Sequence, residues 1–250
     1  MPFDADQQHL VPFVHETRTS KSLHFSIVET QSCMNLAQPD LLDFEYTRIM
    51  MGFLLFHAAP STIAMIGLGG GSLAKFCHRH LPAAHVTVVE INPHVIALRD
   101  EFAIPPDDER FVVVRGDGAR YVKRARGTLD VLLVDGYDYD GMPAQLASAE
   151  FYADCVAGLK PGGVLVANVH QDHADFAALL QRVSDAFGNA ALSVKGRQEG
   201  NAIVFARKGR ALVGGTVEMP PRPASLSPRH WQQLQSAFGL VRAELGRQSA

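Results

Sequence analysis

The sequence predicts a doubly wound α/β fold, in which a mostly parallel β-sheet carries helices on both faces. Two observations predict it. From residue 61 onward, short apolar runs alternate with segments of helical pattern at a regular spacing. These runs are predominantly apolar and do not alternate with polar residues, as expected of parallel strands that are buried on both faces.

The order of these elements is that of a Rossmann-like sheet. The expected strands lie at Thr62–Gly67, His85–Glu90, Phe111–Arg115, Leu129–Asp135 and Gly163–Val169. The expected helices between them lie at Gly71–His80, Pro93–Phe102, Ala119–Arg126 and Ala149–Leu159. A further helix is expected at Ala174–Phe187, followed by closing strands at Ala191–Lys195 and Asn201–Arg207.

The segments that flank this sheet are expected to be short. The first segment carries two strands and a helix, near Phe13–His15, Leu23–Glu29 and Leu41–His57. After the proline-rich stretch Pro220–Pro223, Ser227 and Pro228 are typical of a helix N-cap and first helical position. This helix is expected to reach Leu245, and its apolar face docks on the core or on a second copy in a homodimer. The expected parts are residues 1–58, 59–210 and 211–250.

The composition describes an ordinary globular protein. Of the 250 residues 47% are hydrophobic and 20% charged, which excludes a disordered chain. A net charge of −3 gives no basic field for nucleic acid. Three cysteines without a CxxC pair favour reduced thiols, and the longest apolar run, Ile49–Ala59, is shorter than the ~20 residues of a membrane span. We therefore expect a cytoplasmic protein without membrane or nucleic-acid partners, and His170 and His173 without further ligands do not predict a metal site.

A glycine-rich turn after the first strand of the sheet carries the strongest functional signal. The run Ile66–Ser72 reads IGLGGGS and opens a helix, so that Gly67, Gly69, Gly70 and Gly71 let the backbone turn sharply and approach a nucleoside. Glu90 follows Gly71 by 19 residues, at the end of the second strand, where a carboxylate can accept hydrogen bonds from ribose hydroxyls. The spacing predicts nucleoside binding.

Two further acids follow the next strands of the predicted sheet. Asp117, within Gly116-Asp117-Gly118, follows the third strand, and Asp135 ends the fourth. In an open parallel sheet, ligands bind outside the carboxyl ends of the strands. The glycine turn, Glu90, Asp117 and Asp135 are therefore expected to meet at one edge of the sheet.

From residue 61 to 168 the chain resembles a class I S-adenosylmethionine-dependent transferase, and within that superfamily it most resembles the spermidine synthases (polyamine aminopropyltransferases). The motifs that carry the resemblance are VEINP at 89–93, GDG at 116–118, DGYD at 135–138, EFY at 150–152 and LKPGGV at 159–164. The resemblance implies a methyltransferase-like fold and S-adenosylmethionine or its decarboxylated form as co-substrate. It also implies that Glu90 binds ribose, that Asp117 and Gly118 contact adenine, and that Asp135 and Asp138 are catalytic.

The chain departs from the family pattern at two places. The family's glycine loop carries an aspartate that resembles a clamp for an ammonium group, and Gly70 stands at that position. The family's PTYPSG stretch, which helps to line the amine site, has no counterpart, since residues 193–201 read SVKGRQEGN. Tyr46 matches the tyrosine of the family's YxEM stretch, with Arg48 in place of the glutamate.

The resemblance implies transfer of an aminopropyl group to a small-molecule amine. A sulfonium donor releases a neutral thioether, so the enzyme must supply a deprotonated amine in line with the carbon next to sulfur. Asp135 is expected to deprotonate the amine with help from Asp138, and Tyr46, Tyr137 and His170 are expected to line the acceptor site. Two alternatives stay open: methyl transfer from intact S-adenosylmethionine to a small molecule, which the neutral Gly70 favours, and a catalytically silent nucleoside-binding protein.

Overall fold

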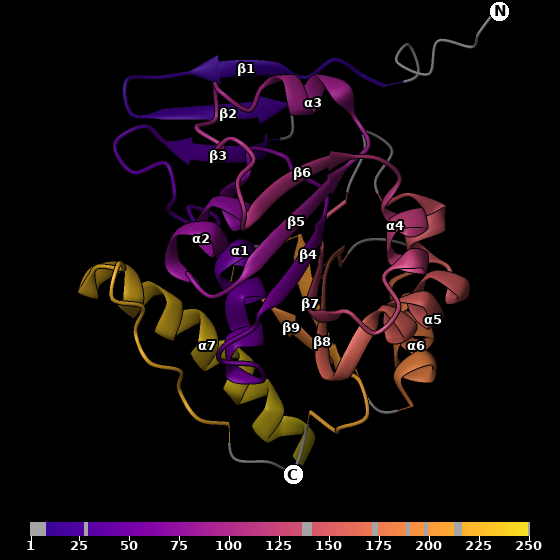
Figure 1. Cartoon of the computed structure of the whole chain (residues 1–250). Coiled ribbons are helices and arrows are strands. Elements are labelled where there is room, and N and C mark those ends of the chain that lie inside the picture. Colours follow the sequence, from indigo (N-terminus) through magenta and orange to yellow (C-terminus); the bar gives the residue numbers. More distant parts are fainter. Residues whose placement is uncertain are drawn as a thin grey trace, which may run out of the picture.

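Figure 1 shows the computed structural model of the chain, which contains two β-sheets and describes residues 9–27, 30–136, 142–171, 175–188, 191–197, 200–212 and 217–249. The smaller sheet has three antiparallel strands, β1 (Phe13–Glu16), β2 (Ser20–His24) and β3 (Thr30–Asn35). Sequence analysis predicted two strands in this region. The strand expected at Leu23–Glu29 is wrong, because β2 ends at His24 and a separate strand, β3, begins at Thr30.

The larger sheet has seven strands in the order β6-β5-β4-β7-β8-β10-β9. Their bounds are β4 (Thr62–Ile66), β5 (His85–Glu90), β6 (Phe111–Arg115), β7 (Leu129–Val134), β8 (Leu159–His170), β9 (Leu192–Lys195) and β10 (Asn201–Arg207). The first five strands in this order are parallel, and β10 pairs antiparallel with both β8 and β9. The predicted mostly parallel α/β sheet is confirmed.

Helices cover both faces of the seven-stranded sheet, as Figure 1 shows. One face carries α1 (Glu45–Met50), the 3₁₀ helix η2 (Met51–Leu55), α2 (Ser72–His80) and α7 (Pro228–Ser249). The other face carries α4 (Gly118–Arg124), α5 (Ala149–Gly158) and α6 (Phe176–Phe187). The short helix α3 (Pro93–Ala97) and the 3₁₀ helix η3 (Ala144–Ala147) lie in the connections. The two faces bury separate apolar clusters, so the sheet is apolar on both sides, as the sequence of its strands predicts.

Several predicted elements differ in extent from the structure, among them the last helix, which runs to Ser249 and not to Leu245. The helix expected at Leu41–His57 begins at Glu45 and changes to 3₁₀ geometry at Met51. The helix expected at Pro93–Phe102 ends at Ala97, and the strand expected at Gly163–Val169 begins earlier, at Leu159. The strands β4, β5, β6 and β7 agree with their predicted bounds to within a residue.

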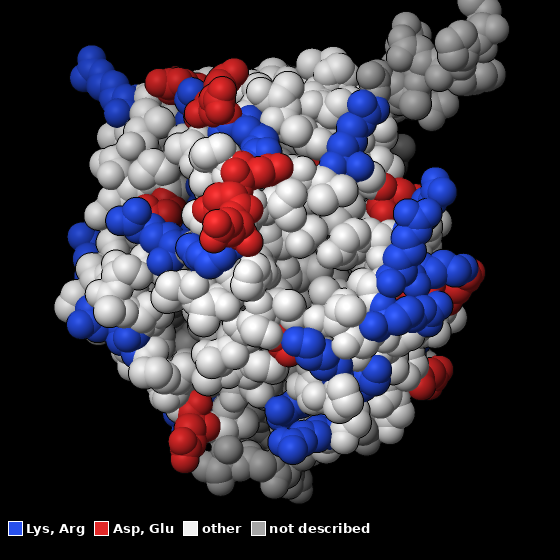
Figure 2. Space-filling view, viewed as in Figure 1, with Lys and Arg blue, Asp and Glu red and all other residues white. Residues whose placement is uncertain are grey.

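Charged side chains lie on the outside of the molecule in groups of both signs (Figure 2). Basic residues gather over α4, where Lys123 and Arg126 form ion pairs with Glu150 and Asp154 of α5. Within the described part of the chain, no helix is both long and apolar enough to cross a membrane.

The amino ends of the central strands are tied together by one buried carboxylate, that of Asp130 in β7. Its Oδ2 accepts hydrogen bonds from the backbone N–H groups of Ser61 and Thr62, each at 2.9 Å, and from the Ser61 hydroxyl at 2.6 Å. Lys160 of β8 lies 3.0 Å from the other carboxylate oxygen. Burial alone would raise the pKa of Asp130, but these donors outweigh it and hold that pKa well below its usual range.

Replacing this carboxylate is expected to destabilise the sheet in a pH-dependent way. Asp130→Asn removes the charge that Lys160 and the two N–H groups stabilise, at a cost of about 1–3 kcal/mol in the free energy of unfolding at pH 7. Since the folded-state pKa is depressed, the stabilisation is present above the unfolded pKa of about 4 and is lost as the pH falls further.

Urea unfolding of parent and variant at pH 7 and at pH 3 measures this difference. It is expected to shrink at the lower pH, and a difference that stays constant would contradict the electrostatic account.

Candidate active site

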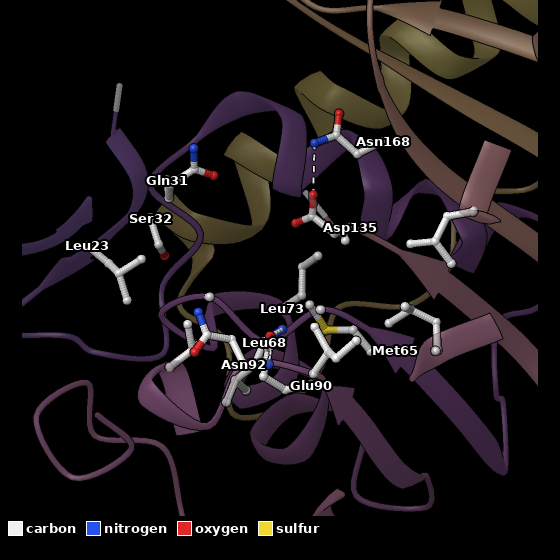
Figure 3. Close-up of a pocket in the computed structure, with 18 of the residues that line it drawn as sticks. Leu23, Gln31, Ser32, Met65, Leu68, Leu73, Glu90, Asn92, Asp135 and Asn168 are labelled. Carbon is white, nitrogen blue, oxygen red and sulfur yellow. Dashed lines mark hydrogen bonds between the residues drawn. The ribbon is translucent and has the colours of Figure 1, made fainter. Parts of the chain in front are cut away.

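A cavity of about 550 Å³ lies at the carboxyl edge of the large sheet, where the sequence predicts a ligand site. Its volume falls within the range of about 300–1,000 Å³ that is typical of small-molecule sites. The segments after β4, β5, β6 and β7 line it, together with α1, β3 and the ends of β8 and β10. Figure 3 shows Glu90, Asn92 and Leu68 on one side of this cavity and Asp135 and Asn168 on the other.

The first turn of the glycine-rich loop requires glycine at position 67. Gly67 has a φ of +93°, and a Cβ there would lie 2.3 Å from the carbonyl oxygen of Asp135. The N–H of Asp135 in turn donates to the carbonyl of Ile66 at 2.9 Å. The ends of β4 and β7 therefore approach each other more closely than any other residue at position 67 permits.

The next glycines divide between the cavity and the protein interior. Gly67 and Gly69 line the cavity, and the nearest atom to a Cβ at Gly69 would be a Ser32 carbon at 3.8 Å, so space is open there. Gly70 and Gly71 do not line the cavity, and their expected contact with a ligand stays a prediction. A Cβ at Gly70 would meet the Ser32 hydroxyl at 2.5 Å, and one at Gly71 would meet Ile104 at 2.6 Å.

Glu90 lies at the end of β5 and lines the cavity, and each of its carboxylate oxygens accepts a backbone hydrogen bond. Its Oε2 accepts from the N–H of Leu68 at 2.8 Å, and its Oε1 accepts from the N–H of Asn92 at 2.7 Å. Burial raises the pKa of Glu90, whereas these backbone donors oppose the shift. Each carboxylate oxygen retains acceptor capacity toward the cavity. The glycine loop and Glu90 are thus one hydrogen-bonded unit.

Asp117 is close to the cavity, but its side chain does not line it. The flanking Gly116 and Gly118 do line the cavity, and the N–H of Gly116 donates to the Glu90 carbonyl at 2.9 Å. The Asp117 carboxylate is the N-cap of α4 and accepts from the N–H of Arg120 at 3.1 Å. The structure therefore places Asp117 at the expected edge in a helix-capping position.

Asp135 lies across the cavity from Glu90 and has two side-chain donors (Figure 3). The amide of Asn168 donates to its Oδ1 at 2.8 Å, and the hydroxyl of Tyr46, in α1, donates to its Oδ2 at 3.3 Å. Burial raises the pKa of Asp135, while Asn168, Tyr46 and the more distant His170 act in the opposite direction. A carboxylate with a raised pKa is a better proton acceptor.

His170 and Tyr46 line the cavity on the Asp135 side, as expected from the sequence. His170 ends β8, and its Cα pairs with that of Asn201 in β10, which also lines the cavity. The expected catalytic Asp138 and the expected acceptor-site residue Tyr137 lie outside the described residues.

Sequence analysis missed Asn168, which holds Asp135 in place, and two further residues that line the cavity, Gln31 and Ser32. Asn168 was read as part of an apolar strand, although a polar residue two positions before the strand end, on the edge that already carries Asp135, is a usable signal. Gln31 and Ser32 come from β3, a strand that the sequence did not predict. The cavity therefore combines a nucleoside-sized hollow beside Glu90 with a buried carboxylate suited to take up a proton.

The family model of the spermine/spermidine synthase domain matches residues 43–195 of this chain. A polyamine aminopropyltransferase from Chromobacterium violaceum is 38% identical over 194 residues, which cover 77% of this chain and 74% of the relative. One from Neisseria meningitidis serogroup A is 37% identical over 195 residues, with the same coverage of both chains.

Solved structures agree at the level of the fold. A probable spermidine synthase from Corynebacterium glutamicum superposes with a TM-score of 0.70 at 22% identity, over 92% of this chain and 91% of that one. The matched part of the sequence includes the glycine loop, Glu90, Asp117, Asp135 and the segment up to β9. The resemblance predicted from the sequence is confirmed, and the chain belongs to the spermine/spermidine synthase family.

Proposed function

We propose that this chain is a transferase that moves the aminopropyl group of decarboxylated S-adenosylmethionine to a small-molecule amine. The observation that carries the proposal is the charge of the cavity. Among the described residues that line it, the formally charged side chains are two carboxylates, Glu90 and Asp135, and none is a lysine or arginine. Such a lining attracts a sulfonium with an ammonium tail and offers the carboxylate of intact S-adenosylmethionine no lysine or arginine.

The relatives support the same reaction. The curated proteins that match this chain at 37–38% identity are named polyamine aminopropyltransferases. A spermidine synthase in complex with the transition-state analogue AdoDATO shares the fold, with a TM-score of 0.63 at 19% identity, over 94% of this chain and 87% of that one. For this chain we assign the acceptor only as an amine, because the family's PTYPSG stretch, which helps to line the amine site, has no counterpart in residues 193–201.

The proposed roles follow from the two sides of the cavity. Glu90 accepts hydrogen bonds from the ribose hydroxyls, and the open space beside Gly69 takes the sugar and the thioether. Asp135 accepts a proton from the acceptor amine, with Tyr46 and Asn168 fixing the direction of its carboxylate. The expected adenine contact of Asp117 and the expected assistance of Asp138 belong to this proposal as well.

The reaction balances without a further reactant. The lone pair of the amine attacks the carbon next to sulfur, the carbon–sulfur bond breaks, and its electron pair stays on sulfur as the neutral thioether of methylthioadenosine. The proton that the amine loses passes to Asp135 and then to solvent. An alkyl amine with a pKa near ~10 is mostly protonated at neutral pH, so this proton transfer is required for attack.

A donor assay tests the proposed reaction. The purified chain is incubated with either decarboxylated or intact S-adenosylmethionine and a panel of di- and polyamines, and the products are separated by chromatography. Methylthioadenosine formed only with the decarboxylated donor is the expected result. S-adenosylhomocysteine as product would replace the proposal by methyl transfer, and binding without any product would indicate a silent nucleoside-binding protein.

Asp135→Asn is expected to lower kcat by at least about 100-fold, because the amide cannot accept the amine proton. The substitution keeps the acceptor for Asn168, and Tyr46 can turn its hydroxyl to accept from the new amide. Nucleoside binding is therefore expected to remain within about threefold of the parent, measured by calorimetric titration of methylthioadenosine. Unchanged turnover would remove Asp135 from the mechanism.

The raised pKa of Asp135 also predicts how Asp135→Asn changes the free energy of unfolding. Because burial raises the folded-state pKa of Asp135, the folded protein loses stability as the pH rises from the unfolded pKa through the folded one. Asp135→Asn removes that penalty, so the variant is expected to be at least as stable as the parent at pH 7 in urea unfolding. Asp154→Asn, at a half-buried ion pair of α5 outside the cavity lining, is the control for a lost carboxylate elsewhere in the fold.

Glu90→Gln is expected to weaken nucleoside binding roughly ten- to a hundredfold, since one acceptor oxygen becomes a donor that faces the N–H of Leu68 or Asn92. The Michaelis constant for the amine is expected to change less than that for the donor, because Glu90 lies across the cavity from Asp135. Glu150→Gln, on the outer surface of α5, is the matched control. Equal effects of the two substitutions would contradict the assignment of Glu90.

A further inference from the structure

The segment before β1 lies against the nucleoside side of the cavity. His9 and Leu10 both line the cavity, and we call these two residues the N-terminal wall. The charge of His9 acts on the carboxyl of Glu90, which places the imidazole on the Glu90 side. Neither residue belongs to a helix or strand, so something outside regular secondary structure must hold this wall in position.

Asn92 holds the N-terminal wall through a single side chain that makes two hydrogen bonds. Its Nδ2 donates to the carbonyl of Leu10 at 2.9 Å, and its Oδ1 accepts from the N–H of His94 as the N-cap of α3. Its own N–H donates to Glu90 at 2.7 Å. Asn92 is 7% exposed, so its amide is fixed by protein contacts on all of these atoms.

We propose that the N-terminal wall completes the nucleoside-binding side of the cavity and that Asn92 is the residue that positions it. This inference deepens the proposed function and depends on it. Glu90 binds the ribose from inside, and His9 and Leu10 cover the same part of the ligand from outside. Because Asn92 contacts both Glu90 and Leu10, it couples the inner and outer contacts. Asn92 touches no reacting atom and acts by placing the wall.

The carboxamide of Asn92 allows a selective test, because only its Nδ2 contacts the N-terminal wall, whereas its Oδ1 caps α3. Asn92→Ser keeps a helix N-cap and is too short to reach the Leu10 carbonyl. Asn92→Asp also keeps the cap, but it turns an oxygen toward the Leu10 carbonyl oxygen in place of the donor. Both variants are expected to weaken methylthioadenosine binding roughly three- to tenfold, the effect of one lost hydrogen bond.

Calorimetric titration gives the affinity, and steady-state kinetics separates the two substrates. The Michaelis constant for the sulfonium donor is expected to rise, and that for the amine is expected to stay within twofold. Asn35→Asp is the matched control, because Asn35 also accepts backbone hydrogen bonds through Oδ1, from Ala37 and Gln38, and lies outside the cavity lining. This variant is expected to bind as the parent does.

A double-mutant cycle with His9→Ala distinguishes positioning of the wall from a general loss of structure. If Asn92 acts through the wall, His9→Ala combined with Asn92→Ser binds no more weakly than the weaker single variant. Additive losses would overturn the proposal. Affinities within twofold of the parent for both Asn92 variants would also overturn it. A loss of affinity confined to Asn92→Asp would overturn it as well, because the effect would then come from a negative charge beside Glu90.

Methylthioadenosine binding and aminopropyl transfer by the parent protein distinguish a failure of this inference from a failure of the proposed function. A parent that binds no methylthioadenosine removes the proposed function and the wall with it. A parent that binds methylthioadenosine and transfers the aminopropyl group, with indifferent Asn92 variants, removes the wall alone. Urea unfolding of each variant establishes that the folded protein is titrated, and His9→Ala, at a residue outside regular structure, supplies the measurement should an Asn92 variant fail to fold.

Discussion

The close approach between the ends of β4 and β7 determines how the cavity is built. Gly67 leaves room for the Asp135 carbonyl, and the N–H of Asp135 closes the contact on Ile66. The chain beyond Gly67 then presents the N–H of Leu68 to Glu90, at the end of the neighbouring strand. A single backbone contact thus fixes both carboxylates relative to each other, and the ligand space between them follows from it.

The two carboxylates differ in their partners, and this difference suits two tasks. Glu90 is held by backbone N–H groups, whose positions are set by the sheet and the glycine loop, as a rigid binding contact requires. Asp135 is held by the side chains of Tyr46 and Asn168, which come from α1 and β8 and can adjust when its protonation changes. Burial raises the pKa of both acids, which favours proton uptake at Asp135, whereas at Glu90 the backbone donors oppose this shift and favour the charged carboxylate.

The sheet could be predicted from the sequence because strands that are buried on both faces consist mainly of apolar residues. Glu90 and Asp135 could be predicted because each lies at the carboxyl end of such a strand. The change to 3₁₀ geometry after Met50 has no such signature in the sequence. A Cβ at Gly52 would meet Val241 of α7 at 2.9 Å, so this segment packs closely against a residue far along the chain. The contact between Gly70 and Ser32 was missed for the same reason, because Ser32 comes from β3, which the local pattern did not reveal.

The position of Ser32 bears on the substitution that most separates this chain from the family pattern. A Cβ at position 70 would lie 2.5 Å from the Ser32 hydroxyl and 2.9 Å from the Phe102 ring, so an aspartate there requires these two side chains to shift. The N-terminal sheet therefore disfavours the negative charge that the family pattern places in the glycine loop. The described carboxylates in the cavity lining are Glu90, engaged by the loop, and Asp135, so the proposed function assigns Asp135 as the counter-charge for both the donor's ammonium and the attacking amine.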